Sequence, residues 1–313
     1  MSRFKVVVTD QVFPSLDVER EILASIDATV EVADGTADGV AALAADADAL
    51  LNTYLPIGSD LIDSLERCRI IARYGIGVDN VDLTKAKGAG IVVTNVPDYS
   101  VEEVASHALA LILALLRKLP QADAYLRSGG WGIEGMRPLR RISELTFGLV
   151  GFGRIARRLA SSVEALGATL VAHDPYVAPG PGMPEMVSLG ELAARADVIS
   201  IHSPLTPETE GMINRRFIDQ MKPGAILINT SRGKLVVLDD VIAALQSGHL
   251  GGAGLDVFET EPLDPARING IPHLLATPHM AYYSEESLRE SQRKAATQIV
   301  KVLTGEQPDY PVN

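Results

Sequence analysis

The sequence has 313 residues, 47% hydrophobic and 22% charged, which is typical of a folded protein and long enough for two domains. The formal net charge of −12 and the lack of a clustered basic patch argue against nucleic acid as a partner. The single cysteine, Cys68, excludes an internal disulfide. The sequence shows neither a signal segment nor an apolar stretch long enough to cross a bilayer, so we expect a cytoplasmic protein with no membrane contact.

The first third of the chain predicts a parallel sheet, because short apolar runs alternate with helix-like stretches. The expected strands are residues 4–9, 47–52, 69–73 and 91–94. The expected helices are residues 18–25, 37–45 and 59–67, with Ser59 as the N-cap of the last. This part of the sequence therefore indicates one α/β domain.

The alternation breaks at residues 95–100, where we place a crossing between domains. A long helix is expected from Val101 to Leu119, and Pro120 should end it because proline cannot continue a helix interior. Residues 121–145 then form an irregular arm that contains Trp131.

A second alternating part opens with a dinucleotide-binding fingerprint over residues 147–156. Gly151 permits a tight turn, Gly153 lets the backbone approach a pyrophosphate, and Ala156 is a permitted variant of the third glycine. The pyrophosphate would rest on the N–H groups at the start of the following helix. Asp174 ends the next apolar run, where its carboxylate would accept hydrogen bonds from both ribose hydroxyls and repel a 2′-phosphate. The sequence therefore predicts NAD rather than NADP.

The rest of this part continues the alternation. Further strands are expected at residues 168–174, 197–202, 225–229, 253–257 and 274–277, and helices at 154–166, 189–195, 215–220, 238–246 and about 284–303. This pattern predicts a doubly wound sheet of six or seven strands. We expect the last, amphipathic helix to pack back on the first domain.

Polar residues directly follow several of these strands, at the carboxyl ends of the strands, where doubly wound folds bind ligands. They are His202, Thr230-Ser231-Arg232, Asp256 and His279. Singly each could be a loop residue, but together they are expected to line one crevice.

Among the six histidines, His279 is best placed for acid–base chemistry, which benefits from a carboxylate that orients the imidazole. Glu259 and Glu261 both lie shortly upstream, and the residues alone do not choose between them. Arg232 offers a planar cation that can bind a carboxylate through two hydrogen bonds and polarise a neighbouring carbonyl.

The sequence resembles the D-isomer-specific 2-hydroxyacid dehydrogenase family over essentially its whole length. The resemblance rests on seven ordered motifs: Arg73-Tyr74-Gly75-Ile76-Gly77-Val78-Asp79-Asn80, Thr94-Asn95-Val96-Pro97, Gly148 to Ala156, His202-Ser203-Pro204-Leu205-Thr206, Asn229-Thr230-Ser231-Arg232-Gly233, Gly254 to Pro262, and Thr277-Pro278-His279. It implies a Rossmann NAD-binding domain over residues 99–284, inserted in a flavodoxin-like substrate-binding domain made of residues 1–98 and 285–313. It also implies a homodimer formed partly through residues 101–145, and no metal.

The resemblance also implies the roles of individual residues. Glu261, directly before the proline, would pair with His279, and Arg232 would hold the substrate carboxylate and carbonyl. The backbone of Gly75, Ile76 and Gly77 would help to bind the substrate. The cofactor would be held at its carboxamide by Asp256, covered at its pyrophosphate by Arg154 and Ile155, and walled by His202, Ser203, Thr230 and Ser231. Hydride would pass between nicotinamide C4 and substrate C2, with His279 giving or taking the hydroxyl proton.

Two positions bear on which branch of the family is meant. Asn52 stands where phosphoglycerate dehydrogenases carry an arginine for the phosphate, and aromatic residues after His279, including Tyr282, resemble the corepressor branch of C-terminal-binding proteins. We expect Asn52 and Tyr282 to face the substrate side chain. The main hypothesis is an NAD-dependent dehydrogenase of 2-keto or D-2-hydroxy acids. The alternative is a dimeric interaction protein that senses NAD(H) with little turnover.

Overall fold

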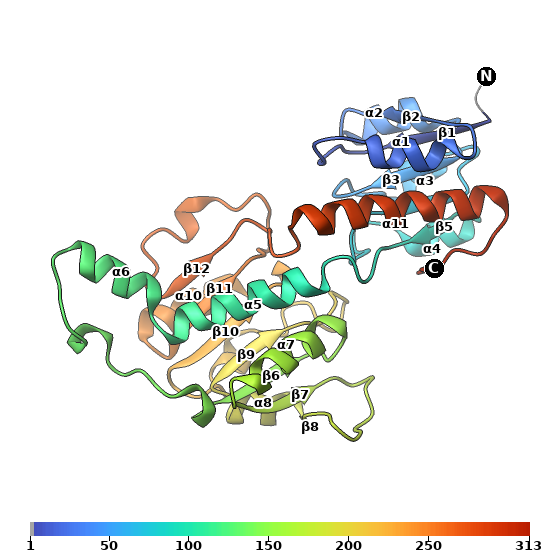
Figure 1. Cartoon of the computed structure of the whole chain (residues 1–313). Coiled ribbons are helices and arrows are strands. Elements are labelled where there is room, and N and C mark those ends of the chain that lie inside the picture. Colours follow the sequence, from blue (N-terminus) through green and yellow to red (C-terminus); the bar gives the residue numbers. More distant parts are fainter. Residues whose placement is uncertain (1–2) are drawn as a thin grey trace. The chain divides into compact units, whose positions relative to one another are not determined.

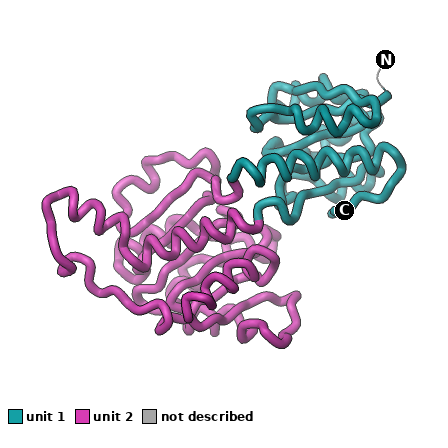
Figure 2. The backbone as a smooth tube through the Cα atoms, in the orientation of Figure 1, with its two compact units in different colours: residues 1–100, 284–313 teal, residues 101–283 magenta. Residues whose placement is uncertain are grey.

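The chain forms two compact units, seen in the computed structural model, which describes residues 3–313 (Figures 1 and 2). Unit 1 comprises residues 3–100 together with 284–313, and unit 2 comprises residues 101–283. Both are α/β units with parallel sheets, as the sequence predicts. Among the described residues, no helix is both long and apolar enough to cross a bilayer.

Unit 1 contains a five-stranded parallel sheet in the order β2-β1-β3-β4-β5. Its strands are β1 (Phe4–Val8), β2 (Ala28–Val32), β3 (Ala49–Asn52), β4 (Ile70–Arg73) and β5 (Val92–Thr94). Helices α1 (Asp17–Ala24) and α11 (Glu285–Thr304) cover one face, and α2 (Ala37–Ala44), α3 (Ser59–Asp63) and α4 (Leu83–Gly88) cover the other. Alternate strand residues serve the two faces: Val6 packs toward α1 and α11, and Val7 packs toward the opposite helices. The last helix therefore packs on the first domain, as predicted.

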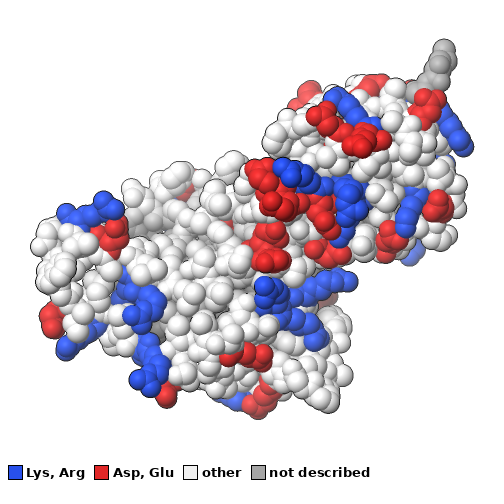
Figure 3. Space-filling view, in the orientation of Figure 1, with Lys and Arg blue, Asp and Glu red and all other residues white. Residues whose placement is uncertain are grey.

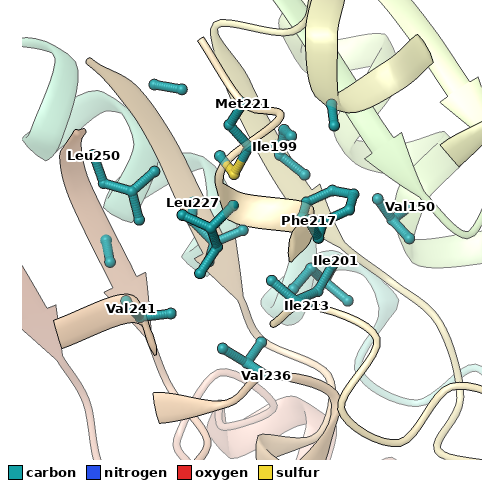
Figure 4. Close-up of a cluster of buried hydrophobic side chains, with 14 of the residues drawn as sticks. Val150, Ile199, Ile201, Ile213, Phe217, Met221, Leu227, Val236, Val241 and Leu250 are labelled. Carbon is teal, nitrogen blue, oxygen red and sulfur yellow. The ribbon is translucent and has the colours of Figure 1, made fainter. Parts of the chain in front are cut away.

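Unit 2 contains a seven-stranded parallel sheet in the order β12-β11-β10-β9-β6-β7-β8. The strands are β6 (Thr146–Val150), β7 (Thr169–His173), β8 (Glu185–Met186), β9 (Val198–Ile201), β10 (Ala225–Asn229), β11 (Leu250–Leu255) and β12 (Leu274–Ala276). Helices α5 (Val101–Leu116) and α7 (Arg154–Ala165) pack on one face. Helices α8 (Leu189–Arg195), α9 (Arg215–Ile218) and α10 (Leu238–Ser247) pack on the other. Figure 4 shows the core on this second face, a cluster of buried side chains that includes Phe217, Met221, Ile199 and Leu227.

Three local predictions are wrong. Pro120 does not end the long helix: α5 stops at Leu116, and Pro120 lies in the first turn of a separate helix, α6 (Leu119–Arg127), where its missing N–H costs nothing. Ser59 does not cap α3. Gly58 is the N-cap, and the Ser59 hydroxyl donates instead to Asp82 at the start of α4. The predicted helix over 59–67 accordingly ends at Asp63.

The sequence interpretation also missed two strands and two helices, namely β2, β8, α4 and α6, the last of which occupies part of the expected irregular arm. Both strands lie at sheet edges and are partly exposed, so they lack the continuous apolar run that marks the central strands. Figure 3 shows acidic and basic side chains close together on the visible face, rather than a separate basic patch.

Candidate active site

The glycine turn after β6 is shaped by the backbone that follows β9. Gly151 has φ +88°, and a Cβ at this position would lie 2.6 Å from the carbonyl oxygen of His202. No residue with a side chain fits there. The next residue, Phe152, donates its backbone N–H to Asp174 Oδ2 over 2.8 Å, so the carboxylate after β7 is held beside the turn.

Helix α7 begins at this turn with its first N–H groups uncapped by any side chain. Its N-cap is Gly153, and no side-chain capping bond is present. Arg154, exposed, and Ile155, half-buried, occupy the first helical positions. Unpaired N–H groups at the positive end of a helix form an anion site, and the missing Cβ at Gly153 keeps the approach open.

Two buried polar atoms at the carboxyl ends of neighbouring strands lack partners among the described residues: Nδ1 of His202, after β9, and Oγ1 of Thr230, after β10. Burial lowers the pKa of His202 to about 4, so its ring is neutral near pH 7. Its other nitrogen lies 2.9 Å from the Ser200 hydroxyl. Buried polar atoms normally find partners, so these two atoms indicate where a ligand would complete the hydrogen bonding.

The turn, the uncapped helix and His202 lie at the carboxyl ends of β6 and β9, where the strand order reverses, which is the ligand-binding position of a doubly wound sheet. Asp174 and Thr230 follow the neighbouring strands β7 and β10. Together these groups fit a dinucleotide. Ser203 and Ser231, predicted to wall the cofactor, donate their hydroxyls to the strand carbonyls of Val150 and Ile201 and so hold their own loops.

His279, after β12, and Glu261, after β11, form a close pair. His279 Nδ1 lies 2.6 Å from Glu261 Oε2, and Glu261 Oε1 accepts the backbone N–H of Phe258 over 2.9 Å. Burial raises the pKa of Glu261, but these two contacts and the nearby charge of Arg232 outweigh it, so the pKa lies below the ordinary glutamate value. Glu261 is therefore ionised near neutral pH.

Glu259, the other candidate, has a separate role. Its Oε1 accepts the backbone N–H of Leu238 over 3.0 Å, at the first residue of α10, and its Oε2 lies 3.8 Å from Arg267. A carboxylate at this position satisfies a helix N–H and complements the helix dipole. The structure thus brings Glu261, and not Glu259, to His279.

Arg232 is held close to this pair by the loop after β10. A Cβ on Gly233 would lie 1.9 Å from the backbone carbon of Phe258, so the loops after β10 and β11 can meet this closely only because residue 233 is glycine. The Asn229 side chain donates to the Arg232 carbonyl over 2.8 Å, and Arg232 Nη1 donates to Ser231 O over 2.9 Å.

Asp256 is fully buried, and both of its carboxylate oxygens bind the His279 loop. Oδ1 accepts the Thr277 hydroxyl at 2.5 Å and the Met280 N–H at 2.9 Å, and Oδ2 accepts the Ala281 N–H at 2.9 Å. His107, on α5, lies 3.0 Å from the Thr277 hydroxyl. These contacts give Asp256 a role in holding the loop, while its predicted contact with nicotinamide stays a prediction.

This loop holds His279 in a conformation that side chains rarely adopt, with φ +51°. The histidine's own N–H donates to Asp256 O over 2.8 Å. Sequence reasoning did not find Thr277 or His107 as supports, because an isolated threonine or a histidine within an apolar helix carries no local signal. Tyr282, three residues after His279, places its ring 6.1 Å from the His279 ring in an edge-to-face arrangement.

The substrate-binding residues predicted in unit 1 lie at the carboxyl ends of β3 and β4. Ile76 O accepts from the Asn95 side chain over 2.7 Å, and Gly75 and Gly77 flank it in a half-buried loop. Asn52 is different: it is fully buried, donates to Thr9 Oγ1 and Leu55 O, and accepts from the Asn80 side chain. These contacts support a structural role for Asn52 rather than the expected substrate contact, because no polar atom of its amide is left for a ligand.

Comparison with known proteins places this geometry in a family. Residues 109–281 match the family model "D-isomer specific 2-hydroxyacid dehydrogenase, NAD binding domain". The chain is 36% identical to the D-3-phosphoglycerate dehydrogenase of Mycobacterium tuberculosis over 98% of its own length, and it spans 58% of that relative. It is 36% identical to the glyoxylate reductase of Thermococcus litoralis over 82% of its own length and 80% of the relative.

Solved structures support the same family placement. The D-lactate dehydrogenase of Aquifex aeolicus, in complex with NAD and lactic acid, superposes with a TM-score of 0.86 at 29% identity, covering 96% of both chains. The TT0316 protein of Thermus thermophilus superposes with a TM-score of 0.89 at 36% identity, covering 99% of this chain and all of the other. The chain therefore belongs to the D-isomer-specific 2-hydroxyacid dehydrogenase family.

Proposed function

We propose that this protein is an NAD-dependent dehydrogenase that moves a hydride between NAD(H) and C2 of a small 2-keto acid or D-2-hydroxy acid. The observation that carries the proposal is the pair formed by His279 and the ionised Glu261, which lies beside Arg232. The pair is at the carboxyl ends of the strands of unit 2, the side of the sheet where the dinucleotide fits. Membership of the family supports the reaction class.

Each residue of this set has a distinct task in the proposed reaction. Bound NAD(H) would supply or accept the hydride. Glu261 holds the Nδ1 side of the imidazole, and Nε2 of His279 would give or take the proton at the substrate oxygen. Arg232 binds the substrate carboxylate through its planar guanidinium and polarises the neighbouring carbonyl.

The cofactor would be held by the chain's own turn and strand ends. Asp174 would accept the ribose hydroxyls, and the uncapped start of α7, at Arg154 and Ile155, would take the pyrophosphate. His202 Nδ1 and Thr230 Oγ1 would gain the partners that they lack. Selection of NAD over NADP follows from the charge of Asp174.

The roles of the two units follow from the same proposal. Residues 99–284 would bind NAD, and residues 1–98 with 285–313 would bind the substrate through the backbone of Gly75, Ile76 and Gly77. Tyr282 would contact the substrate side chain. A homodimer through residues 101–145 is supported by exposed apolar side chains there, among them Trp131 at 85% exposure. The cytoplasm is the proposed location.

The test is NADH oxidation with a panel of 2-keto acids, comparing wild type with His279→Ala. We expect turnover to fall at least about 100-fold, the usual scale for a lost general acid, while NADH binding survives. His273→Asn is the matched control, because among the described residues the side chain of this histidine bonds Gln121, away from the proposed site, and asparagine tolerates its positive φ. Undiminished turnover in His279→Ala would contradict the assignment. Tight NADH binding with no turnover of any acid would favour the NAD(H)-sensing alternative.

A further inference from the structure

Helix α5 lies close against strand β11 because the strand carries glycines on the facing side. A Cβ on Gly252 would lie 3.0 Å from a side-chain carbon of Leu115, and a Cβ on Gly254 would lie 3.1 Å from the Cβ of Leu111. Side chains four residues apart share one face of a helix, and alternate residues share one face of a strand. This pairing therefore brings the next turn of α5 over the carboxyl end of β11.

The next residues in these two rows are polar: His107 on α5 and Asp256 directly after β11. They meet through Thr277, which directly follows β12. The Thr277 hydroxyl lies 2.5 Å from Asp256 Oδ1 and 3.0 Å from His107 Nε2, and Nε2 lies 3.7 Å from the Asp256 carboxylate. The apolar row thus ends in a polar contact that joins α5 to the ends of two strands.

The donors and acceptors in this contact determine where its protons lie. A carboxylate only accepts hydrogen bonds, so the single proton of the Thr277 hydroxyl lies on the bond to Asp256. The hydroxyl oxygen then offers a lone pair to His107, and Nε2 of His107 must carry the proton of that bond. The hydrogen bonds therefore run in one direction, from His107 to Thr277 to Asp256, and each strengthens the next.

Asp256 in turn holds the loop that carries His279. Its Oδ1 also accepts the Met280 N–H and its Oδ2 accepts the Ala281 N–H, both over 2.9 Å. Its backbone carbonyl accepts the His279 N–H over 2.8 Å. A side-chain-bearing residue at φ +51° persists only where the surrounding contacts hold it there. A change in the orientation of this carboxylate would therefore displace the imidazole of His279.

We propose that His107 is a positioning residue of the reaction: by donating to Thr277 it fixes the Asp256 carboxylate, which holds His279 in place for proton transfer. Small displacements of a reacting group slow a reaction strongly, so a contact outside the reacting atoms can matter for turnover. The inference rests on the proposed function and extends it to a residue outside the seven sequence motifs.

The first experiment compares two amides that differ by one methylene group. In His107→Gln the side-chain nitrogen reaches the position of Nε2 and can donate to Thr277, whereas in His107→Asn it ends near the position of Nδ1. We expect kcat for 2-keto acid reduction to fall at least about tenfold in His107→Asn and to stay within about threefold of wild type in His107→Gln. KM for the acid should change less than about threefold in both, because Arg232, its proposed ligand, lies on another loop.

Ser106→Asn is the matched control, because it places the same amide on the exposed side of α5 and should keep the wild-type kcat. A wild-type kcat in His107→Asn would overturn the inference. Equal losses in His107→Asn and His107→Gln would also overturn it, since they would show that the hydrogen bond to Thr277 is not what the reaction needs.

The second experiment asks whether His107 acts through Thr277. Thr277→Val removes the hydroxyl, and Thr277→Ser, which keeps one, should retain most of the wild-type kcat. We expect the double variant His107→Asn/Thr277→Val to match the less active single variant within about twofold, because both changes break one chain of hydrogen bonds. Losses that multiply would show that His107 acts by another route and would overturn the proposal.

A third measurement does not depend on turnover. Nitrogen NMR of protein with isotope-labelled histidine reports which ring nitrogen carries a proton, and the signal lost in His107→Gln identifies His107. We expect a proton on its Nε2 and a shift of this resonance in Thr277→Val. If wild type turned over no 2-keto acid, the proposed function would fail, and this measurement would still test the contact. An Nε2 without a proton would overturn the inference.

Discussion

His279 and Glu261 lie 18 residues apart in the chain and 2.6 Å apart in the structure, each on a loop that follows a different strand. Two buried features hold these loops in place. Asp256, at the end of β11, binds the loop after β12 through both carboxylate oxygens. Gly233 lets the loop after β10 touch the backbone of Phe258. The proposed acid–base pair is thus set by backbone geometry as well as by its own hydrogen bond.

We predict that Glu261→Gln lowers kcat at least about tenfold with little change in NADH affinity. An amide keeps a hydrogen-bonding oxygen but loses the charge that stabilises a protonated imidazole during proton transfer. The check is steady-state kinetics of 2-keto acid reduction together with an NADH titration.

Glu259→Gln provides the control, since its side-chain oxygen can still accept the Leu238 N–H and it does not reach His279. Its kcat should stay within about twofold of wild type. A loss of kcat in Glu259→Gln as large as in Glu261→Gln would show that the pairing seen here does not carry the reaction.

Gly233→Ala should displace Arg232 from the proposed site. The added Cβ would lie 1.9–2.5 Å from the backbone of Phe258 and Glu259, which cannot be relieved by turning a side chain. We expect at least about a tenfold fall in kcat/KM and a loss of about 1–3 kcal/mol in the free energy of unfolding. Gly135→Ala, where the nearest neighbour would be 3.8 Å away, should change neither, as kinetics and urea unfolding would show. Wild-type values in Gly233→Ala would contradict the close approach.

The central strands could be predicted from the sequence because they are buried on both faces and appear as continuous apolar runs. Every expected strand was found, whereas β2 and β8, at partly exposed sheet edges, were not foreseen. Pro120 shows a second limit. A proline can stop one helix or start the next, and only the left-handed turn at Lys118 shows that it starts α6 here.

Much of the candidate site could be predicted from one rule, that parallel sheets bind ligands at their carboxyl ends. The rule does not reveal which polar side chains are already hydrogen-bonded to other parts of the chain. Asn52 lies at a strand end, as the rule requires, but its side chain is buried. Its amide is hydrogen-bonded to Thr9 and Asn80, which are 43 and 28 residues away in the chain. Asp10 and Arg73 likewise meet their partners across distances that no local pattern records.

Asp174→Ala should weaken NADH binding and reduce the preference for NAD over NADP. Loss of the carboxylate removes the proposed acceptor for the ribose hydroxyls and the repulsion of a 2′-phosphate. It also removes the acceptor of the Phe152 N–H. We expect the preference for NAD, measured as the ratio of kcat/KM values for the two reduced cofactors, to fall at least about tenfold. If the ratio stayed at the wild-type value, the ribose contact would have to be assigned elsewhere.

Glu19, on α1, is expected to make the stability of unit 1 depend on pH. It is fully buried, where it accepts the Tyr74 hydroxyl over 2.7 Å and the Gln292 side chain over 2.9 Å, with no cation beside it in these contacts. Burial raises its pKa above the ordinary glutamate value of 4.5, more than these hydrogen bonds lower it. The folded chain thus holds this proton more tightly than the unfolded chain.

The free energy of unfolding should therefore fall as the pH rises from about 4.5 through the raised pKa, by at most about 1.4 kcal/mol per pH unit for this one proton. Glu19→Gln carries no titrating group and should lose this part of the slope, whereas Glu21→Gln, an exposed acid on the same helix, should keep it. Urea unfolding of the three proteins at pH 5 and pH 8, followed by circular dichroism, checks this. The same decrease in all three would show that Glu19 is already ionised at pH 5 in the folded chain.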